Sequence, residues 1–194
     1  MAEQKVLNAV TALCRLTARG DLAEPDILQD AGRIMADLVT TDDWLPDAMA
    51  QPHPEYYRQY LLYGDPLDRF SLVSFVWGPG QRTPVHDHTV WGVIAMLRGA
   101  EVEQSFSMED DRLQAIGEEK TLRPGEVAFV SPSIGDIHRV SNYHDDKVSI
   151  SIHLYGGNIG RINRHVFDPE TGRRKPFVSG YSNVLVPNLW APGV

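Results

Sequence analysis

Apolar side chains recur at three- and four-residue spacing over the first forty residues, which is the pattern of amphipathic helices. Over residues 2–19 the apolar positions are Val6, Ala9, Val10, Leu13 and Leu16. A second helix is predicted from Pro25, where a first helical turn accepts proline, through Ile27, Leu28, Ile34, Met35 and Leu38. Residues 41–43, Thr-Asp-Asp before Trp44, predict the cap of a third, short helix.

Beyond Pro54 the pattern changes to short runs of β-forming residues between glycine, proline and polar turns. The predicted strands cover residues 71–77, 90–97, 101–106, 127–130, 137–140 and 148–155, with 177–178 and 184–186 as a further edge. Short strands at such spacing indicate a sandwich or barrel. We therefore expect a mainly β protein, with a helical segment over 1–50 packed on a barrel over 51–194 in one structural domain.

Composition and charge narrow the classes of function. The chain has 194 residues with 18 Lys and Arg against 26 Asp and Glu, a net charge of −8. Such a field repels phosphate backbones, so nucleic acid is not an expected partner. It also repels a small anionic substrate, which would need a local positive group. The lone Cys14, the lack of an apolar run of about 20 residues and the lack of a signal-peptide pattern predict a cytoplasmic protein without a membrane segment.

The most informative polar pattern is His86-Asp87-His88. On a strand, residues i and i+2 face the same side, so both imidazoles point one way and Asp87 the other. Two neutral imidazoles make half of a metal site, and a third ligand must come from another strand. The doublet alone is equally consistent with packed histidines that bind no metal.

Two longer motifs give this doublet a context. Residues 80–88 match G-x5-H-x-H, and residues 132–142 match P-x2-G-x2-H-x3-N. They resemble the two motifs of the cupins, and this resemblance implies a single cupin, jelly-roll-like β-barrel. In that fold the histidine of the second motif meets the first pair inside the barrel, so His86, His88 and His138 are the expected metal ligands.

One departure from the usual cupin pattern bears on chemistry. Metal cupins generally carry a glutamate after three or four intervening residues beyond the doublet, where this chain has Gly92 and Val93. Three neutral imidazoles leave the charge of a metal uncompensated, which favours an anionic substrate ligand such as a thiolate.

A three-histidine cupin site resembles the thiol dioxygenases, cysteine dioxygenase and its relatives. Residues 75–80, 84–89 and 151–155 also resemble segments of that family, the last being its Ser-x-His-x-Tyr triad. The resemblance extends over about residues 50–165. It implies an iron(II) enzyme that adds both atoms of O2 to the sulfur of a small thiol carboxylate and forms a sulfinic acid.

The triad can also be derived from the strand pattern. Ser151, His153 and Tyr155 alternate with apolar residues and share one face of a strand. Adjacent polar groups inside a barrel must bond one another, which predicts a Ser–His–Tyr relay that leaves the phenol near the metal. The alternative is a solvated outer face with the isoleucines inside. In eukaryotic relatives a cysteine is joined to this tyrosine, and here Gly92 takes its position, so Tyr155 is expected to keep a free hydroxyl.

The resemblance also suggests the substrate. Gln59 takes the position at which mammalian-type cysteine dioxygenases carry an arginine for the substrate carboxylate, and Arg164 matches an arginine of the Gln-type bacterial branch, which is mainly 3-mercaptopropionate dioxygenases. Arg164 can bind a carboxylate with two hydrogen bonds and supplies the missing positive group. If the register of the segment around Gln59 shifts by one residue, Arg58 enters the pocket in place of Gln59 and L-cysteine becomes the better substrate. Arg161 is likewise an alternative to Arg164 as the arginine that binds the carboxylate.

Two other classes of function stay open at this point. One is a cupin that binds a small acid without catalysis or with a different metal. The other is a zinc or nickel cupin that carries out hydrolysis or isomerisation. The remaining histidines His53, His144 and His165 are expected at the surface or in local hydrogen bonds, and the sequence leaves the oligomeric state open.

Overall fold

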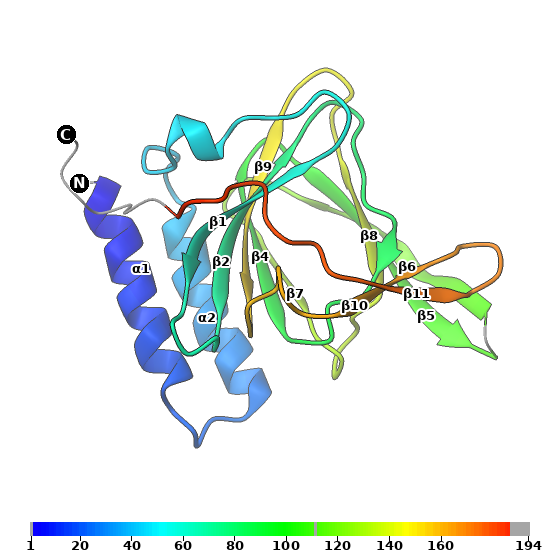
Figure 1. Cartoon of the computed structure of the whole chain (residues 1–194), viewed down its shortest axis with the longest axis horizontal. Coiled ribbons are helices and arrows are strands. Elements are labelled where there is room, and N and C mark those ends of the chain that lie inside the picture. Colours follow the sequence, from blue (N-terminus) through cyan, green and yellow to red (C-terminus); the bar gives the residue numbers. More distant parts are fainter. Residues whose placement is uncertain (1, 111, 187–194) are drawn as a thin grey trace.

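The protein is described by a computed structural model that covers residues 2–110 and 112–186. Two helices precede the strands, α1 (Ala2–Thr17) and α2 (Glu24–Leu38), and a 3-10 turn, η1 (Asp47–Met49), leads into the β structure (Figure 1). The strands are β1 (Arg58–Gly64), β2 (Ser71–Trp77), β3 (Val85–His86), β4 (Gly92–Arg98), β5 (Glu101–Glu109), β6 (Arg112–Leu122), β7 (Val127–Val130), β8 (His138–Asn142), β9 (Ser149–Tyr155), β10 (Arg164–Phe167) and β11 (Arg174–Phe177).

The strands form two antiparallel sheets that face each other as a barrel (Figure 1). The first sheet has the order β1-β2-β9-β4-β7, and the second has the order β11-β10-β3-β8-β5-β6. Helices α1 and α2 cover the outer side of the first sheet, while the β5–β6 ribbon extends away from the barrel. The mainly β cupin barrel with N-terminal helices is therefore confirmed, whereas the expected division near residue 50 stays a prediction.

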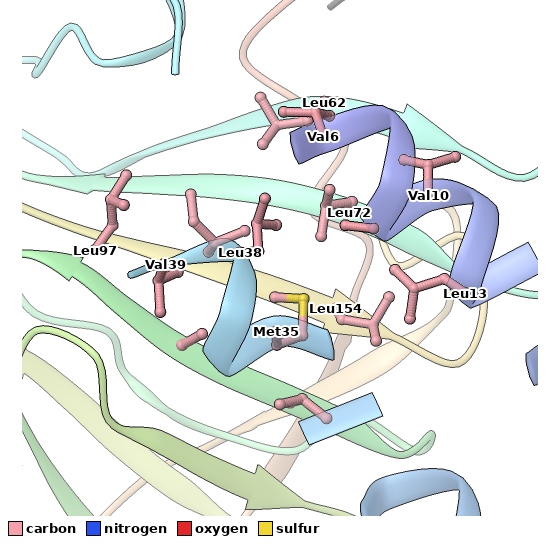
Figure 2. Close-up of a cluster of buried hydrophobic side chains, with 14 of the residues drawn as sticks. Val6, Val10, Leu13, Met35, Leu38, Val39, Leu62, Leu72, Leu97 and Leu154 are labelled. Atoms are coloured by element: carbon pink, nitrogen blue, oxygen red, sulfur yellow. The ribbon is translucent and has the colours of Figure 1, made fainter. Parts of the chain in front are cut away.

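The first sheet is buried on both faces, and each face packs against a different layer. Its outer side chains join those of the helices in one apolar cluster, shown in part in Figure 2 by Val10, Leu13 and Met35 against Leu72 and Leu154. A smaller cluster lies on the inner face. All seven residues of β9 are buried for this reason. The isoleucines of β9 thus face the helices, and its polar residues face the interior of the barrel.

Several sequence predictions for individual elements were wrong or incomplete. The predicted cap at residues 41–43 starts no helix, because Thr41 Oγ1 donates to the Asp43 side chain, and the short helical turn comes later, at η1. Strands β1, β6 and β10 were missed. Residues 184–186 form no strand and are well exposed, with Val184 at 98%.

The edge of β1 is covered instead by the segment just before those residues. Gln59 and Ser182 bond each other twice: the Gln59 amide donates to Ser182 Oγ at 3.0 Å, and the Ser182 amide donates to the Gln59 carbonyl at 2.8 Å. The side-chain amide of Asn183 bonds both the backbone N–H and the carbonyl of Leu61.

Neither described helix is long and apolar enough to cross a membrane.

Candidate metal centre

Three buried histidines converge inside the barrel. His86 lies on β3 directly opposite His138 on β8, and His88 follows just after the end of β3. The ring centroids lie 4.8–4.9 Å apart, and one potential ligand atom of each residue lies within 4.8 Å of the others. The prediction that both residues of the doublet lie on a strand is right for His86 alone, because β3 ends there and Thr89 has a φ of 61°.

The Nδ1 atom of each ring is already engaged. The Nδ1 atom of His86 lies 3.1 Å from the carbonyl oxygen of Pro84. The Nδ1 atom of His88 lies 3.0 Å from Asp136 Oδ1, and that of His138 lies 3.1 Å from Glu103 Oε1. Each of these oxygens accepts a hydrogen bond, so Nδ1 carries the proton and Nε2 has the free lone pair. All three imidazoles could therefore hold a metal ion through Nε2.

The electrostatics of the site favour neutral imidazoles. Burial, followed by the charges of neighbouring histidines, holds the pKa of His86 and of His88 well below the usual range. Metal ions compete with protons for imidazole nitrogen, so a lowered pKa favours metal binding at neutral pH. Three neutral nitrogen donors, each fixed through its second nitrogen, fit a divalent transition-metal ion. Within the described residues, this cluster of possible ligands contains no carboxylate.

Next to the histidines, three polar residues of β9 form a continuous hydrogen-bonded line. Ser151 Oγ lies 2.8 Å from His153 Nε2, and His153 Nδ1 lies 2.8 Å from the Tyr155 hydroxyl. All three residues are buried on the inner face, and the Tyr155 ring stacks on His88 with centroids 5.3 Å apart. The line therefore ends at a tyrosine whose ring packs against one of the candidate ligands. The alternative of a solvated outer face is excluded.

The line continues beyond Ser151 to a residue that the sequence analysis missed. Ser151 Oγ donates to Glu101 Oε2 at 2.9 Å, and the Trp77 indole N–H donates to Ser151 Oγ at 3.1 Å. Burial raises the pKa of Glu101 to about 7, and the hydrogen bond from Ser151 offsets only part of that rise.

The register of β1 assigns Gln59 and Arg58 to opposite faces of the strand, although both residues line one cavity with Ser179. Gln59 lies opposite Phe75, which in turn lies opposite Ser151, so Gln59 shares the inner face with the relay. Its side-chain amide donates to the Gly180 carbonyl at 2.6 Å. Arg58 lies opposite Val76, whose side chain belongs to the cluster under the helices. Their side chains thus leave β1 on opposite faces.

Arg164 is a buried cation without an acidic partner among the described residues. It is 3% exposed, donates to Ser179 Oγ at 2.7 Å and lies 4.6 Å from the centre of the Phe177 ring. Its Nε has no hydrogen-bond partner within the described chain. Burial lowers the pKa of Arg164, and the nearby phenols of Tyr155 and Tyr57 act against that shift. An unpaired, buried guanidinium is a strong attractor for an anion.

The other candidate arginine and the remaining histidines lie outside the three-histidine cluster. Arg161 has 77% of its side chain exposed and lies 3.9 Å from Asp68. His165 bonds Asp87 at 2.8 Å, so Asp87 points away from the candidate ligands as predicted. His53 and His144 take no part in the cluster.

Sequence reasoning missed the acidic residues around the site. Glu101 and Glu103 are two residues apart on β5 and therefore share a face, and Asp136 lies two residues before His138. The signal available was an acidic pair on one face of a predicted strand, next to a motif whose histidines need oriented nitrogens.

The fold and this site together define a cupin barrel with three converging histidines that could hold a metal ion. Comparison with known proteins agrees: the family model "Cysteine dioxygenase type I" matches residues 29–168. Rat cysteine dioxygenase type 1 is 27% identical over 175 residues, covering 80% of this chain and 86% of the rat protein. The human protein is 32% identical over 109 residues, and this match covers 55% of the present chain and 53% of the human protein.

Among solved structures, a Klebsiella pneumoniae protein with a double-stranded β-helix domain is 18% identical. The superposition has a TM-score of 0.46 and covers 58% of this chain and 82% of the Klebsiella protein. The chain belongs to the cysteine dioxygenase type I family, a family of dioxygenase enzymes.

Proposed function

We propose that this protein is a mononuclear iron(II) thiol dioxygenase that acts on a small thiol carboxylate, 3-mercaptopropionate in preference to L-cysteine. The reaction is RSH + O2 → RSO2H, in which both oxygen atoms end on sulfur. The observation that carries the proposal is the convergence of three histidines, one of which stacks on the ring of Tyr155. Family membership supports the class of reaction.

In this proposal His86, His88 and His138 hold the metal through Nε2. When bound, iron(II) supplies a binding position for the thiolate and the capacity to activate dioxygen. The three imidazoles carry no net charge, so a substrate anion is needed to balance the metal. Pro84, Asp136 and Glu103 keep the three rings in place through Nδ1.

Arg164 orients the substrate in this scheme. Its buried guanidinium has an N–H without a hydrogen-bond partner. Burial is the main cause of the lowered pKa of His86 and of His88, and the charge of Arg164 adds to it. Arg164 therefore lies within electrostatic range of the candidate ligands. A carboxylate on the substrate satisfies this donor and neutralises the charge. Tyr155 donates or accepts a proton at its hydroxyl, with His153 and Ser151 behind it.

Gln59 favours the carboxylate without an α-amino group. The side chain on the inner face of β1 is a neutral amide, whereas Arg58 leaves the strand on the other face. A single buried guanidinium then suffices for 3-mercaptopropionate. The competing assignment, L-cysteine, is supported by the names of the matched relatives, which are cysteine dioxygenases.

Oxygen consumption tests the proposal directly. Protein reconstituted anaerobically with iron(II) is given 3-mercaptopropionate or L-cysteine at matched concentrations, and the iron content is measured in the same samples. Faster uptake with 3-mercaptopropionate is expected. A preference for L-cysteine would contradict the role of Gln59 and keep the thiol dioxygenase; no uptake with either thiol would contradict the dioxygenase itself.

Isotope labelling and two variants sharpen the test. With 18O2, both sulfinate oxygens are expected to carry the label, and a single labelled oxygen or hydrogen peroxide alone would contradict the reaction. His138→Ala should lose the metal, whereas His144→Ala, outside the cluster, should keep it. Tyr155→Phe should lower turnover with only a modest loss of iron.

A further inference from the structure

The hydrogen-bonded line on β9 does not end at Ser151 but at a buried carboxyl group. Glu101, 3% exposed, accepts the Ser151 hydroxyl proton at 2.9 Å. The Trp77 N–H also points at Ser151 Oγ. An indole nitrogen only donates, so Trp77 cannot accept the Ser151 proton, and its N–H also acts on Glu101. Ser151 then has one proton to give and one further bond to accept.

This count leaves two arrangements of protons. With Glu101 ionised, Ser151 donates to Glu101, His153 donates from Nε2 to Ser151, and the Tyr155 hydroxyl donates to Nδ1. With Glu101 protonated, the carboxyl donates to Ser151, Ser151 donates to Nε2, and His153 donates from Nδ1 to the Tyr155 oxygen. In this second arrangement the Tyr155 proton is free to point toward the candidate metal centre. Both arrangements use the same heavy-atom distances.

Glu101 also lines a cavity. This cavity, about 720 Å³, lies between the two sheets, and its wall includes Glu101, Glu103, Lys120 and His138. Phe129 and Ile134 on its wall are 39% and 59% exposed, so the cavity reaches the surface. A water molecule needs about 30 Å³, so the space holds several. The cavity therefore gives a proton on Glu101 a path to solvent.

We propose that Glu101 is the terminal proton acceptor of the relay: it takes up, through Ser151, His153 and Tyr155, the proton that the substrate thiol loses on binding, and releases it into the cavity. This assignment rests on the proposed function. Glu101 touches neither substrate nor metal and acts only through Ser151.

The transfer balances as a chain of single proton shifts. The thiol S–H bond breaks and its proton goes to the Tyr155 oxygen. Tyr155 passes its own proton to His153 Nδ1, the Nε2 proton goes to Ser151, and the Ser151 proton goes to Glu101. The thiol becomes a thiolate and the carboxylate becomes a carboxylic acid, while the three relay residues end neutral. No oxidant or reductant takes part.

The acidity of Glu101 suits this task. A carboxyl with a pKa of about 7 is ionised often enough at neutral pH to accept a proton and weak enough as an acid to hold it. The groups facing it are Glu103 on its own strand, Ser151 on β9 and Trp77 on β2. Lys120 of β6 and His138 of β8 line the same cavity. Burial holds the pKa of His153 well below its usual range, so this ring relays protons by changing tautomer and stays uncharged.

Two spectroscopic readouts test the assignment without substrate. In iron-loaded protein, infrared difference spectra should contain a protonated-carboxyl carbonyl band that titrates near pH 7 and is absent from Glu101→Gln. In zinc-loaded protein, which is diamagnetic, 15N NMR should place the His153 proton on Nε2 above about pH 7 and on Nδ1 below it. Glu101→Gln should abolish this pH dependence. The control Glu118→Gln, which removes an exposed carboxylate of β6, should retain both signals.

Kinetics supply the functional readout. Glu101→Gln should lower kcat/KM at neutral pH by about 10²- to 10⁴-fold and shift the profile so that it follows ionisation of the free thiol. A Glu101→Gln profile that superimposes on wild type would overturn the proposal, as would an active wild type whose His153 tautomer ignores pH. Wild type that shows both spectroscopic signals but oxidises no thiol would instead contradict the proposed function and leave the proton path supported.

Discussion

Gly92 lies directly opposite Tyr155 in the β4–β9 pair, and the phenol ring occupies the space that a side chain at position 92 would need. A Cβ atom there would come within 2.9 Å of Tyr155 Cδ1 and 3.0 Å of Val130 Cγ2. Real Cβ atoms do not approach other atoms this closely. The glycine therefore fixes the position of the ring that carries the relay hydroxyl, and it keeps that hydroxyl free of any cross-link from residue 92.

Gly92→Ala should therefore displace the Tyr155 ring. Overpacking at a buried site costs about 1–3 kcal/mol of stability, and a reacting group misplaced by about 1 Å can lose about 100-fold in rate. Urea unfolding and turnover measure the two effects. Gly20→Ala is the matched control, since nothing lies within 4 Å of its Cβ position. Unchanged turnover in Gly92→Ala would contradict the role of the ring position.

Asp136→Asn should weaken metal binding through His88. The carboxylate accepts from His88 Nδ1 and from the amides of His88 and Thr89, and burial raises its pKa. An amide keeps part of this geometry but loses the charge that makes the imidazole a better ligand. Loss of such a partner typically costs about 10- to 100-fold in metal affinity. Anaerobic competition with an iron(II) chelator measures it.

Asp146→Asn, an exposed aspartate in a turn, is the control for that experiment and should bind iron like wild type. Equal iron affinity in Asp136→Asn and wild type would show that this carboxylate does not support His88 as a ligand.

Arg164→Lys should affect only substrates with a carboxylate. A lysine keeps the charge but cannot make the paired hydrogen bonds of a guanidinium. A hydrogen bond to a charged group contributes about 1.5–3 kcal/mol, so kcat/KM for 3-mercaptopropionate should fall by about 10- to 100-fold. A neutral thiol such as 2-mercaptoethanol should show no comparable loss. Arg161→Lys, with its exposed side chain, is the control; equal losses for both thiols would argue against carboxylate binding by Arg164.

Two motifs far apart in the sequence predicted that His138 meets His86 and His88, whereas strand geometry by itself predicts only residues whose partners lie nearby. Ser151, His153 and Tyr155 follow one another at period two on β9, so their shared face follows from strand geometry alone. The acidic residues have distant partners: Glu101 bonds a residue 50 positions away, and Asp136 one that is 48 positions away. No periodicity connects such residues, because their contact depends on how two strands of the barrel are placed.

The missed strands have a related cause. β6 is exposed along most of its length, and its charged residues Glu118, Glu119 and Lys120 carry no apolar alternation. Its pairing with β5 in an exposed ribbon stabilises it through backbone hydrogen bonds, which leave no hydrophobic signature. Residues 184–186 show the reverse: three apolar side chains predicted an edge strand, but Ser182 and Asn183 already bond the β1 backbone there.

The buried Glu101 carboxyl should also give the protein a distinct pH dependence of stability. Its pKa is raised from 4.5 to about 7 in the folded state, so between these values the folded protein holds a proton that the unfolded chain has lost. The contribution of this carboxyl group to the free energy of unfolding is fully present below pH 4.5 and is lost as the pH rises through 7. At about 1.4 kcal/mol per pH unit, the full difference is about 3 kcal/mol. Glu101→Gln cannot ionise, so relative to wild type its stability should rise by about 2.5 kcal/mol between pH 5 and pH 8 in urea unfolding of metal-free protein. Glu118→Gln should show no such gain. A constant difference between Glu101→Gln and wild type across that range would mean that the folded protein does not hold this proton.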